Sequence, residues 1–210
     1  MSDAAWVGVD PGVSGAVVAL DSEARVIAWW DTPTLTVPGP KRHSRRKGTE
    51  GQLIATVRQA YDKSAMARML WDLAGERSIM RVVIEAVQPM PRWGRHKGPG
   101  DAIGSDSGRG SNSFTDFGLG RSLGLWEGIC AALELRVELV PAVTWKAKLV
   151  PRIATDPGVK PLVRRRLVKA AARARALDLF PEFAEHLSRA MDDGRAEAGL
   201  LALYGLRHCS

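Results

Sequence analysis

Two acidic residues stand where short apolar segments of the chain end. Asp10 follows the apolar residues 4–9, and Glu85 follows the apolar residues 82–84. In open sheets of strands and helices, sites are commonly built at strand ends. If these two strands are neighbours, we expect the two carboxylates to converge. Together they would face a reactive phosphate or bind a cation.

A second pair of acids lies near the end of the chain. Asp193 and Glu197 are four residues apart in a predicted helix, so they share one face, whereas Asp192 points about 100° away. Simpler interpretations stay open. Asp193 is also a candidate N-cap, and Glu197 a candidate surface acid paired with Arg195 or another neighbour. Asp10 is also a candidate turn residue, because Asp-Pro-Gly is common turn chemistry.

The four acids together predict a metal site. Carboxylates that meet in one place repel each other and raise one another's pKa. Hard divalent cations relieve that repulsion, and oxygen ligands suit Mg²⁺ or Mn²⁺. Two such ions about 4 Å apart are a known arrangement for phosphodiester cleavage. We therefore expect two ions per site, bound by Asp10, Glu85, Asp193 and Glu197.

The overall charge favours a polyanionic partner. The 210 residues include 30 Lys and Arg against 23 Asp and Glu, which gives a net charge of +7. Among polyanions, nucleic acid is the expected partner of such a chain. The candidate DNA-binding residues are cationic and cluster in predicted loops or helices: Lys41, Arg42, Arg45, Arg46, Lys47, Arg92, Lys146, Lys160, Arg164 and Arg165. The alternative is a solvated basic surface.

Other features limit the setting and the class of protein. No apolar run reaches 18 residues, and the N-terminus lacks the layout of a signal peptide, so no membrane association is expected. Cys130 and Cys209 are too few for a disulfide framework or a zinc site. We expect a reducing, intracellular compartment: cytoplasm, nucleoid, the host cytoplasm of a phage, or an organelle.

Aromatic residues in or beside a Gly-rich segment, residues 88–116, are candidates for stacking on bases. They are Trp93, Phe114 and Phe117. Aromatic rings stack on unpaired bases with little sequence preference. For Phe117 the alternative is a place in the core, as the first residue of the following helix.

The order of predicted elements indicates an α/β fold in a single domain, residues 1–210. Strands are expected at 4–9, 16–20, 25–30, 81–85 and 136–140, and helices at 52–74 (with a break near 62–64), 117–135, 141–148, 161–179 and 193–206. A flexible basic loop is expected at 38–51, a Gly-rich loop at 88–116 and a linker at 150–160. A three-strand meander followed by alternating helices and strands favours a mixed sheet covered by helices.

Several segments resemble one family in consistent order along most of the chain. They are Val7-Gly8-Val9-Asp10-Pro11-Gly12, Val82-Val83-Ile84-Glu85, Gly124-Leu125-Trp126-Glu127-Gly128, Val140-Pro141-Ala142-Val143-Thr144-Trp145-Lys146, Leu179-Phe180-Pro181, Asp193-Gly194-Arg195-Ala196-Glu197-Ala198 and Ala202-Leu203-Tyr204-Gly205. Together they resemble the RuvC-type Holliday-junction resolvases, and most closely the plant chloroplast branch. The resemblance implies a ribonuclease-H-like fold with a mixed five-stranded sheet.

The resemblance also implies an activity in DNA recombination and repair. Members are homodimeric, metal-dependent endonucleases that make paired nicks in four-way DNA junctions. Asp10, Glu85 and Glu197 match the family's metal-binding acids, and position 193 varies within it. The family's catalytic lysine precedes the Phe-Pro pair, which implies Lys169, with Lys160 and Lys146 as alternatives.

Two segments depart from the family, and a third segment suggests a dimer contact. The loop after residue 85 is long, and residues 150–160 look inserted. Gly118, Gly120, Gly124 and Gly128 would let the helix at 117–135 approach a second copy closely.

Two other classes of protein are alternatives to a junction-cleaving nuclease. One is a branched-DNA-binding protein without catalysis. The other is an actin-like nucleotide-binding or kinase module, because residues 10–16 faintly resemble the first phosphate loop of those proteins. Such proteins need a second comparable lobe, and a chain of 210 residues with one such hairpin leaves no room for it.

Overall fold

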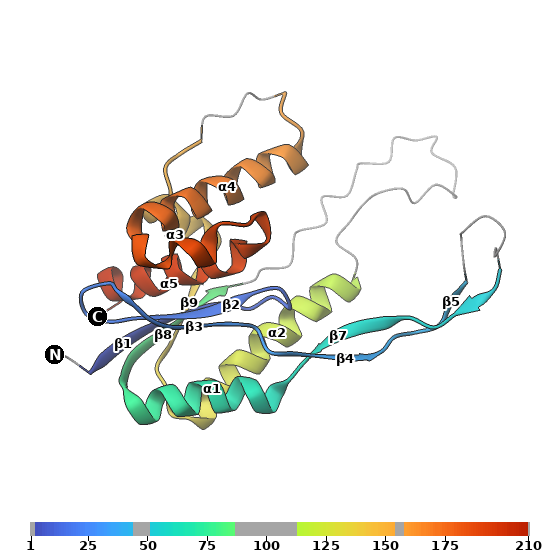
Figure 1. The fold of residues 1–210 in the computed structure, drawn as a ribbon, viewed down its shortest axis with the longest axis horizontal. Coiled ribbons are helices and arrows are strands. Elements are labelled where there is room, and N and C mark those ends of the chain that lie inside the picture. The colour runs from blue at the N-terminus through green and yellow to red at the C-terminus, as the bar shows by residue number, and fades with distance from the viewer. Residues whose placement is uncertain (1–2, 44–50, 87–112, 154–157, 210) are drawn as a thin grey trace, which may run out of the picture.

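A central sheet organises the chain in the computed structural model, which describes residues 3–43, 51–86, 113–153 and 158–209 (Figure 1). The sheet has five strands in the order β3-β2-β1-β8-β9. Their bounds are Val26–Asp31 (β3), Ala16–Leu20 (β2), Ala4–Asp10 (β1), Ser78–Ala86 (β8) and Val137–Pro141 (β9). β1, β2 and β3 form an antiparallel meander, whereas β8 and β9 join in parallel. The predicted α/β class and mixed sheet are confirmed.

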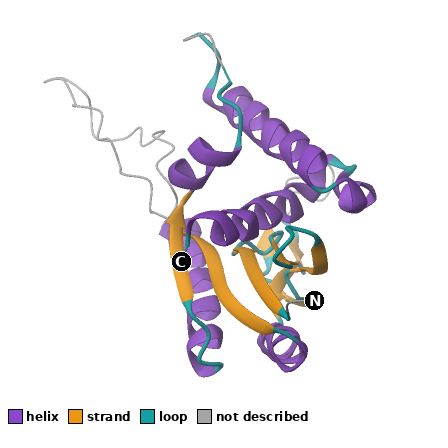
Figure 2. Cartoon of the chain, turned by 90° about the vertical axis from the view of Figure 1, so that its left-hand side faces the viewer, coloured by secondary structure: helices purple, strands orange, loops and turns teal. Residues whose placement is uncertain are grey.

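Helices cover both faces of the sheet (Figures 1 and 2). Successive side chains of β1 point to opposite faces. Val7 and Val9 pack with buried residues of α1 (Lys63–Glu76) and α2 (Ser113–Ala132). The other face packs against α5 (Asp193–His208). β2 is buried throughout, as expected for a strand covered on both sides.

The second half of the chain matches the prediction closely. α3 spans Ala142–Leu149 with Pro141 as its N-cap, and α4 spans Pro161–Leu179, the predicted bounds. Two 3-10 segments, η1 (Pro181–Leu187) and η2 (Ala190–Asp192), connect α4 to α5. In the described part of the chain, no helix is long and apolar enough to cross a membrane.

Gly8 lets α5 lie directly on β1. A Cβ at this position would overlap the Ala198 carbonyl oxygen and the Ala202 backbone nitrogen, both in α5. Gly194, in the first turn of α5, approaches the β1–β2 turn in the same way, since its Cβ would lie 2.7 Å from the Ser14 carbonyl oxygen. These two contacts fix the beginning of α5 beside the end of β1.

The helix predicted at 52–74 is wrong in its first half. Leu53–Ile54 (β6) pairs with Arg42–His43 (β5), and Val57–Tyr61 (β7) pairs with Thr34–Pro38 (β4). Cross-strand pairing decides the structure here, although the apolar spacing fits a helix. The predicted break near 62–64 is the start of α1, where the Asp62 side chain accepts a hydrogen bond from the Ala65 backbone N–H at 3.0 Å.

Parts of the two predicted loops are regular structure. Within the basic loop expected at 38–51, residues 42–43 form a strand, while residues 44–50 lie outside the described part. Within the Gly-rich loop expected at 88–116, α2 already begins at Ser113, and residues 87–112 lie outside the described part. We refer to β4, β5, β6 and β7, residues 34–43 and 51–61, as the ribbon.

Candidate active site

Asp10 is held by the turn that follows β1. The Gly12 backbone N–H points to Asp10 Oδ1 at 3.4 Å, and the Gly15 N–H donates to the Gly12 carbonyl at 3.0 Å. A Cβ on Gly15 would overlap the Asp10 carbonyl oxygen, so the tight turn requires glycine there. Asp10 is thus both a turn residue and a fixed carboxylate at a strand end.

Glu85 lies beside Asp10 on the neighbouring strand. Val9 and Ile84 are partners in the parallel ladder of β1 and β8, and the two acids follow them directly. From α3, the fully buried Trp145 donates its indole Nε1–H to Glu85 Oε2 at 3.1 Å. The strands that carry Asp10 and Glu85 are therefore neighbours, which is the condition for their carboxylates to converge.

α5 brings Glu197 to the same place. Its side chain is buried, with 7% of the residue exposed, and Lys146 of α3 donates to its Oε1 at 2.9 Å. The suggested pairing of Glu197 with Arg195 is wrong. Arg195 instead contacts Asp31, with Nη2 2.6 Å from Oδ2.

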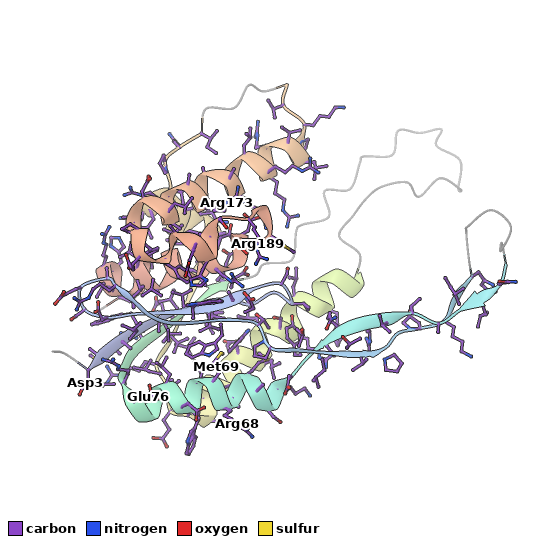
Figure 3. All side chains as sticks on the ribbon, viewed as in Figure 1. Asp3, Arg68, Met69, Glu76, Arg173 and Arg189 are labelled. Carbon is purple, nitrogen blue, oxygen red and sulfur yellow. The ribbon has the colours of Figure 1, made fainter. Side chains whose placement is uncertain are left out.

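Asp193 faces two cations of α4. Lys169 Nζ lies 3.3 Å from its Oδ2, and Arg173 Nη1 lies 3.3 Å from its Oδ1. Figure 3 labels Arg173 on α4, on the side of the sheet that α5 covers. Asp193 is not the N-cap of α5, which is Asp192. Asp192 is buried and pairs with Arg189 at 3.0 Å, apart from the other acids as predicted.

The electrostatics show that three of the carboxylates repel one another. The pKa of Asp10 is raised to about 7, first by burial and then by the negative charges of Glu197 and Glu85. The pKa of Glu85 is also raised, chiefly by burial and further by Glu197, while Lys146 acts in the opposite direction. Burial and the neighbouring carboxylates therefore both disfavour the charged forms of Asp10 and Glu85.

The donor set suits Mg²⁺ or Mn²⁺ chemically, because every acid offers hard oxygen ligands. Among the described residues, however, no three carboxylate, histidine or cysteine groups are close enough to hold one ion as they stand. Lys146 engages Glu197, and two cations engage Asp193. A divalent ion would thus replace an ammonium group at Glu197.

A cavity of about 630 Å³ opens beside these acids. Glu85 and Glu197 line one part of it, and its cationic lining comes from Lys146, Lys169, Arg164 and Arg165. Asp10 and Asp193 are not in its wall. A cavity lined by both acids and cations suits a phosphodiester whose phosphate approaches bound metal ions.

Family models and curated proteins give no match to this chain.

The structure separates the predicted basic residues into groups. Lys146 and Lys169 reach the acids, and Arg164 and Arg165 line the cavity. Lys160 is the N-cap of α4. Lys41 is exposed on the ribbon, and Arg42 belongs to β5. Four candidates lie outside the described residues: Arg45, Arg46, Lys47 and Arg92.

The predicted stacking aromatics are only partly described. Trp93 lies outside the described residues, as does the side chain of Phe114. Phe117 lies on α2 with 72% of its surface exposed, so a place in the core is wrong.

Sequence reasoning missed three contacts of the site. The motif at 140–146 assigns no role to Trp145, yet this residue holds Glu85. Arg173 has a signal in the sequence, because it stands four residues after Lys169 and so shares its helix face. The sequence suggests Lys146 as a DNA contact or an alternative catalytic lysine, and the structure makes it the ion partner of Glu197.

Proposed function

We propose that the protein is a metal-dependent endonuclease that resolves four-way DNA junctions by paired phosphodiester hydrolysis. The observation that carries the proposal is the mutual repulsion of Asp10, Glu85 and Glu197 beside a cavity with a basic wall. Buried acids that repel each other are costly unless a cation joins them. The RuvC-type resemblance of these same residues supports the choice of substrate.

The proposed roles follow from the positions of the side chains. Asp10, Glu85 and Glu197 would hold two Mg²⁺ or Mn²⁺ ions, with Asp193 as a further ligand. Bound ions of this kind activate water and stabilise the leaving oxygen in phosphodiester cleavage. Trp145 fixes one oxygen of Glu85, which restricts the carboxylate to one orientation.

The two lysines take different parts in the proposal. Lys146 neutralises Glu197 in the metal-free protein and becomes available for a phosphate when a metal replaces it. Lys169 has 39% of its side chain exposed and lines the cavity, so it is placed to offset negative charge that develops on the scissile phosphate. Arg164 and Arg165 would contact neighbouring phosphates of the strand.

Paired cuts require two sites, so we propose a homodimer. Gly118, Gly120, Gly124 and Gly128 of α2 each have open space where a Cβ would stand. Together with the exposed Phe117, they leave a part of α2 that a second copy could approach closely. A ribonuclease-H-like fold is part of the same proposal, and the mixed five-stranded sheet supports it.

The test uses a labelled four-way junction with Mg²⁺ or Mn²⁺, and a linear duplex of the same sequence as control. Symmetric nicks in the junction alone are expected. Junction binding without nicks would instead support a non-catalytic branched-DNA-binding protein. ATP hydrolysis without nicks would support the actin-like alternative.

A further inference from the structure

The ribbon extends away from the sheet and the helices that cover it (Figure 1). Thr34–Pro38 pairs with Val57–Tyr61 over five residue pairs, and Arg42–His43 pairs with Leu53–Ile54 further out. An isolated two-stranded ribbon is marginally stable in water. A ribbon in this position is therefore expected to gain stability from something that it binds.

Apolar side chains of the ribbon are exposed. Val57 has 72% of its surface exposed, Leu53 57%, Leu35 50% and Ile54 44%. They stand on a ribbon whose other described residues are mostly polar, cationic or small. The ribbon therefore offers both apolar contacts and charge to a partner.

The charge of the ribbon selects the kind of partner. Its described residues include Lys41, Arg42 and Arg58 and no acid. Lys41 and Arg58 are exposed. Between β7 and β4, the Gln59 side-chain amide donates to Thr36 Oγ1 at 3.1 Å. A basic surface without acids favours a polyanion over another protein.

The root of the ribbon is joined to the turn that holds Asp10. The Tyr61 hydroxyl donates to the Pro11 carbonyl at 3.4 Å, and the Asp62 N–H donates to the Pro33 carbonyl at 2.9 Å. Pro11 directly follows Asp10. The direction of the ribbon is therefore fixed relative to the candidate active site, so both could engage one nucleic acid.

We propose that the ribbon lies in the major groove of a DNA duplex that leads away from the active site. The major groove of B-DNA admits a two-stranded β-ribbon. Lys41 and Arg58 would contact phosphates, and the exposed apolar side chains would contact sugars and thymine methyl groups. This inference rests on the proposed function for its DNA substrate, and it adds a second contact outside the catalytic cavity.

The test compares three variants of the full chain. In the first, residues 37–58 are replaced by Asn-Gly, which joins the ladder partners Thr36 and Gln59 through a tight hairpin turn. The second combines Lys41→Gln with Arg58→Gln. The third is a matched control, Arg68→Gln, on α1 away from the ribbon (Figure 3). Circular dichroism shows which variants fold, and the double variant suffices if the shortened one does not.

Junction affinity is measured as a function of salt, together with a hydroxyl-radical footprint. The slope of log K against log salt is negative, and each lost phosphate contact reduces its magnitude by about 1. The slope of the double variant should therefore be smaller in magnitude by about 2. The shortened variant should lose protection on a duplex arm. Arg68→Gln should behave as wild type. If the ribbon variants keep the wild-type salt slope and footprint, the inference is overturned. It is also overturned if the ribbon variants change the oligomeric mass but keep the wild-type salt slope, because the ribbon would then contact a protein.

The outcomes also separate this inference from the proposed function. Ribbon-dependent DNA binding by a wild-type protein that makes no nicks would uphold the ribbon contact and refute the nuclease. Nicking by the wild-type protein with a footprint that does not depend on the ribbon would refute the ribbon contact alone.

Discussion

Lys146 Nζ lies 2.9 Å from Glu197 Oε1, where 22% of the lysine side chain and 9% of the glutamate side chain are exposed. The ammonium group balances one of three acids that otherwise repel each other. In the proposed enzyme, the same carboxylate must bind a divalent cation, so lysine and metal compete for it.

The first prediction concerns this competition. Lys146→Met should lower the free energy of unfolding in EDTA by about 3 kcal/mol, because it leaves a buried carboxylate unpaired. Mn²⁺ should then raise the melting temperature of the variant more than that of the wild type. Differential scanning fluorimetry with and without Mn²⁺ measures both. Equal Mn²⁺ effects in the two proteins would contradict the competition.

The second prediction concerns Trp145. Trp145→Phe removes the N–H that holds Glu85 and should weaken Mn²⁺ binding about tenfold, as measured by calorimetry. Trp126→Phe is the matched control. Trp126 is equally buried, lies on the other face of the sheet, and its Nε1 has no hydrogen-bond partner among the described residues. If both variants weaken Mn²⁺ binding equally, Trp145 does not position Glu85.

The third prediction concerns pH. The pKa of Asp10 is about 7 in the fold and near 3.8 when the group is unperturbed, so between these values the folded state binds more protons than the unfolded state. The stability contributed by Asp10 is therefore greatest at low pH and declines as pH rises through about 7. Above about pH 7 the charged Asp10 carboxylate destabilises the fold. Asp10→Asn removes this charge, so in EDTA the variant should be more stable than wild type at pH 8.

Chemical denaturation in EDTA from pH 5 to pH 8 checks the third prediction. The stability gained by Asp10→Asn should shrink toward pH 5, where the carboxyl is protonated in the fold. A gain that is the same at both ends of this range would show that Asp10 does not titrate there.

The fourth prediction concerns the contact of α5 with β1. Gly8→Ala places a methyl group against the backbone of Ala198 and Ala202, so it should destabilise the fold by at least about 2 kcal/mol. Gly75→Ala is the matched control, since nothing lies within 4 Å of its Cβ position in α1. It should stabilise the protein by about 0.5–1 kcal/mol. Urea unfolding compares them, and a mild Gly8→Ala would contradict the close approach.

The parts of the structure that can be predicted are those that the local order of apolar and polar residues determines. Strand-end acids such as Asp10 and Glu85 were found because short apolar runs precede them. The ribbon was missed because the spacing of residues 53–61 also fits a helix, and the strand that pairs with β7, Thr34–Pro38, lies about twenty residues earlier in the chain. Local periodicity contains no information about such a partner.

The contacts within the site were harder to predict for a related reason. The acids come from β1, β8 and α5, and helical spacing grouped only the two that share α5. Trp145 and Arg173 reach Glu85 and Asp193 across gaps in sequence of 60 and 20 residues. Their roles depend on how α3 and α4 pack over the sheet, which no motif specifies.

The most direct test of the proposed function is cleavage of a four-way junction by wild type and Asp10→Asn in Mn²⁺. Both proteins should bind the junction with similar affinity, because Asp10 lies outside the cavity wall and the basic residues are unchanged. The wild type should make paired symmetric nicks, and Asp10→Asn should lose cleavage by at least about 10³-fold. Cleavage by Asp10→Asn at the wild-type rate, or no cleavage by either protein, would contradict the proposed metal-dependent nuclease.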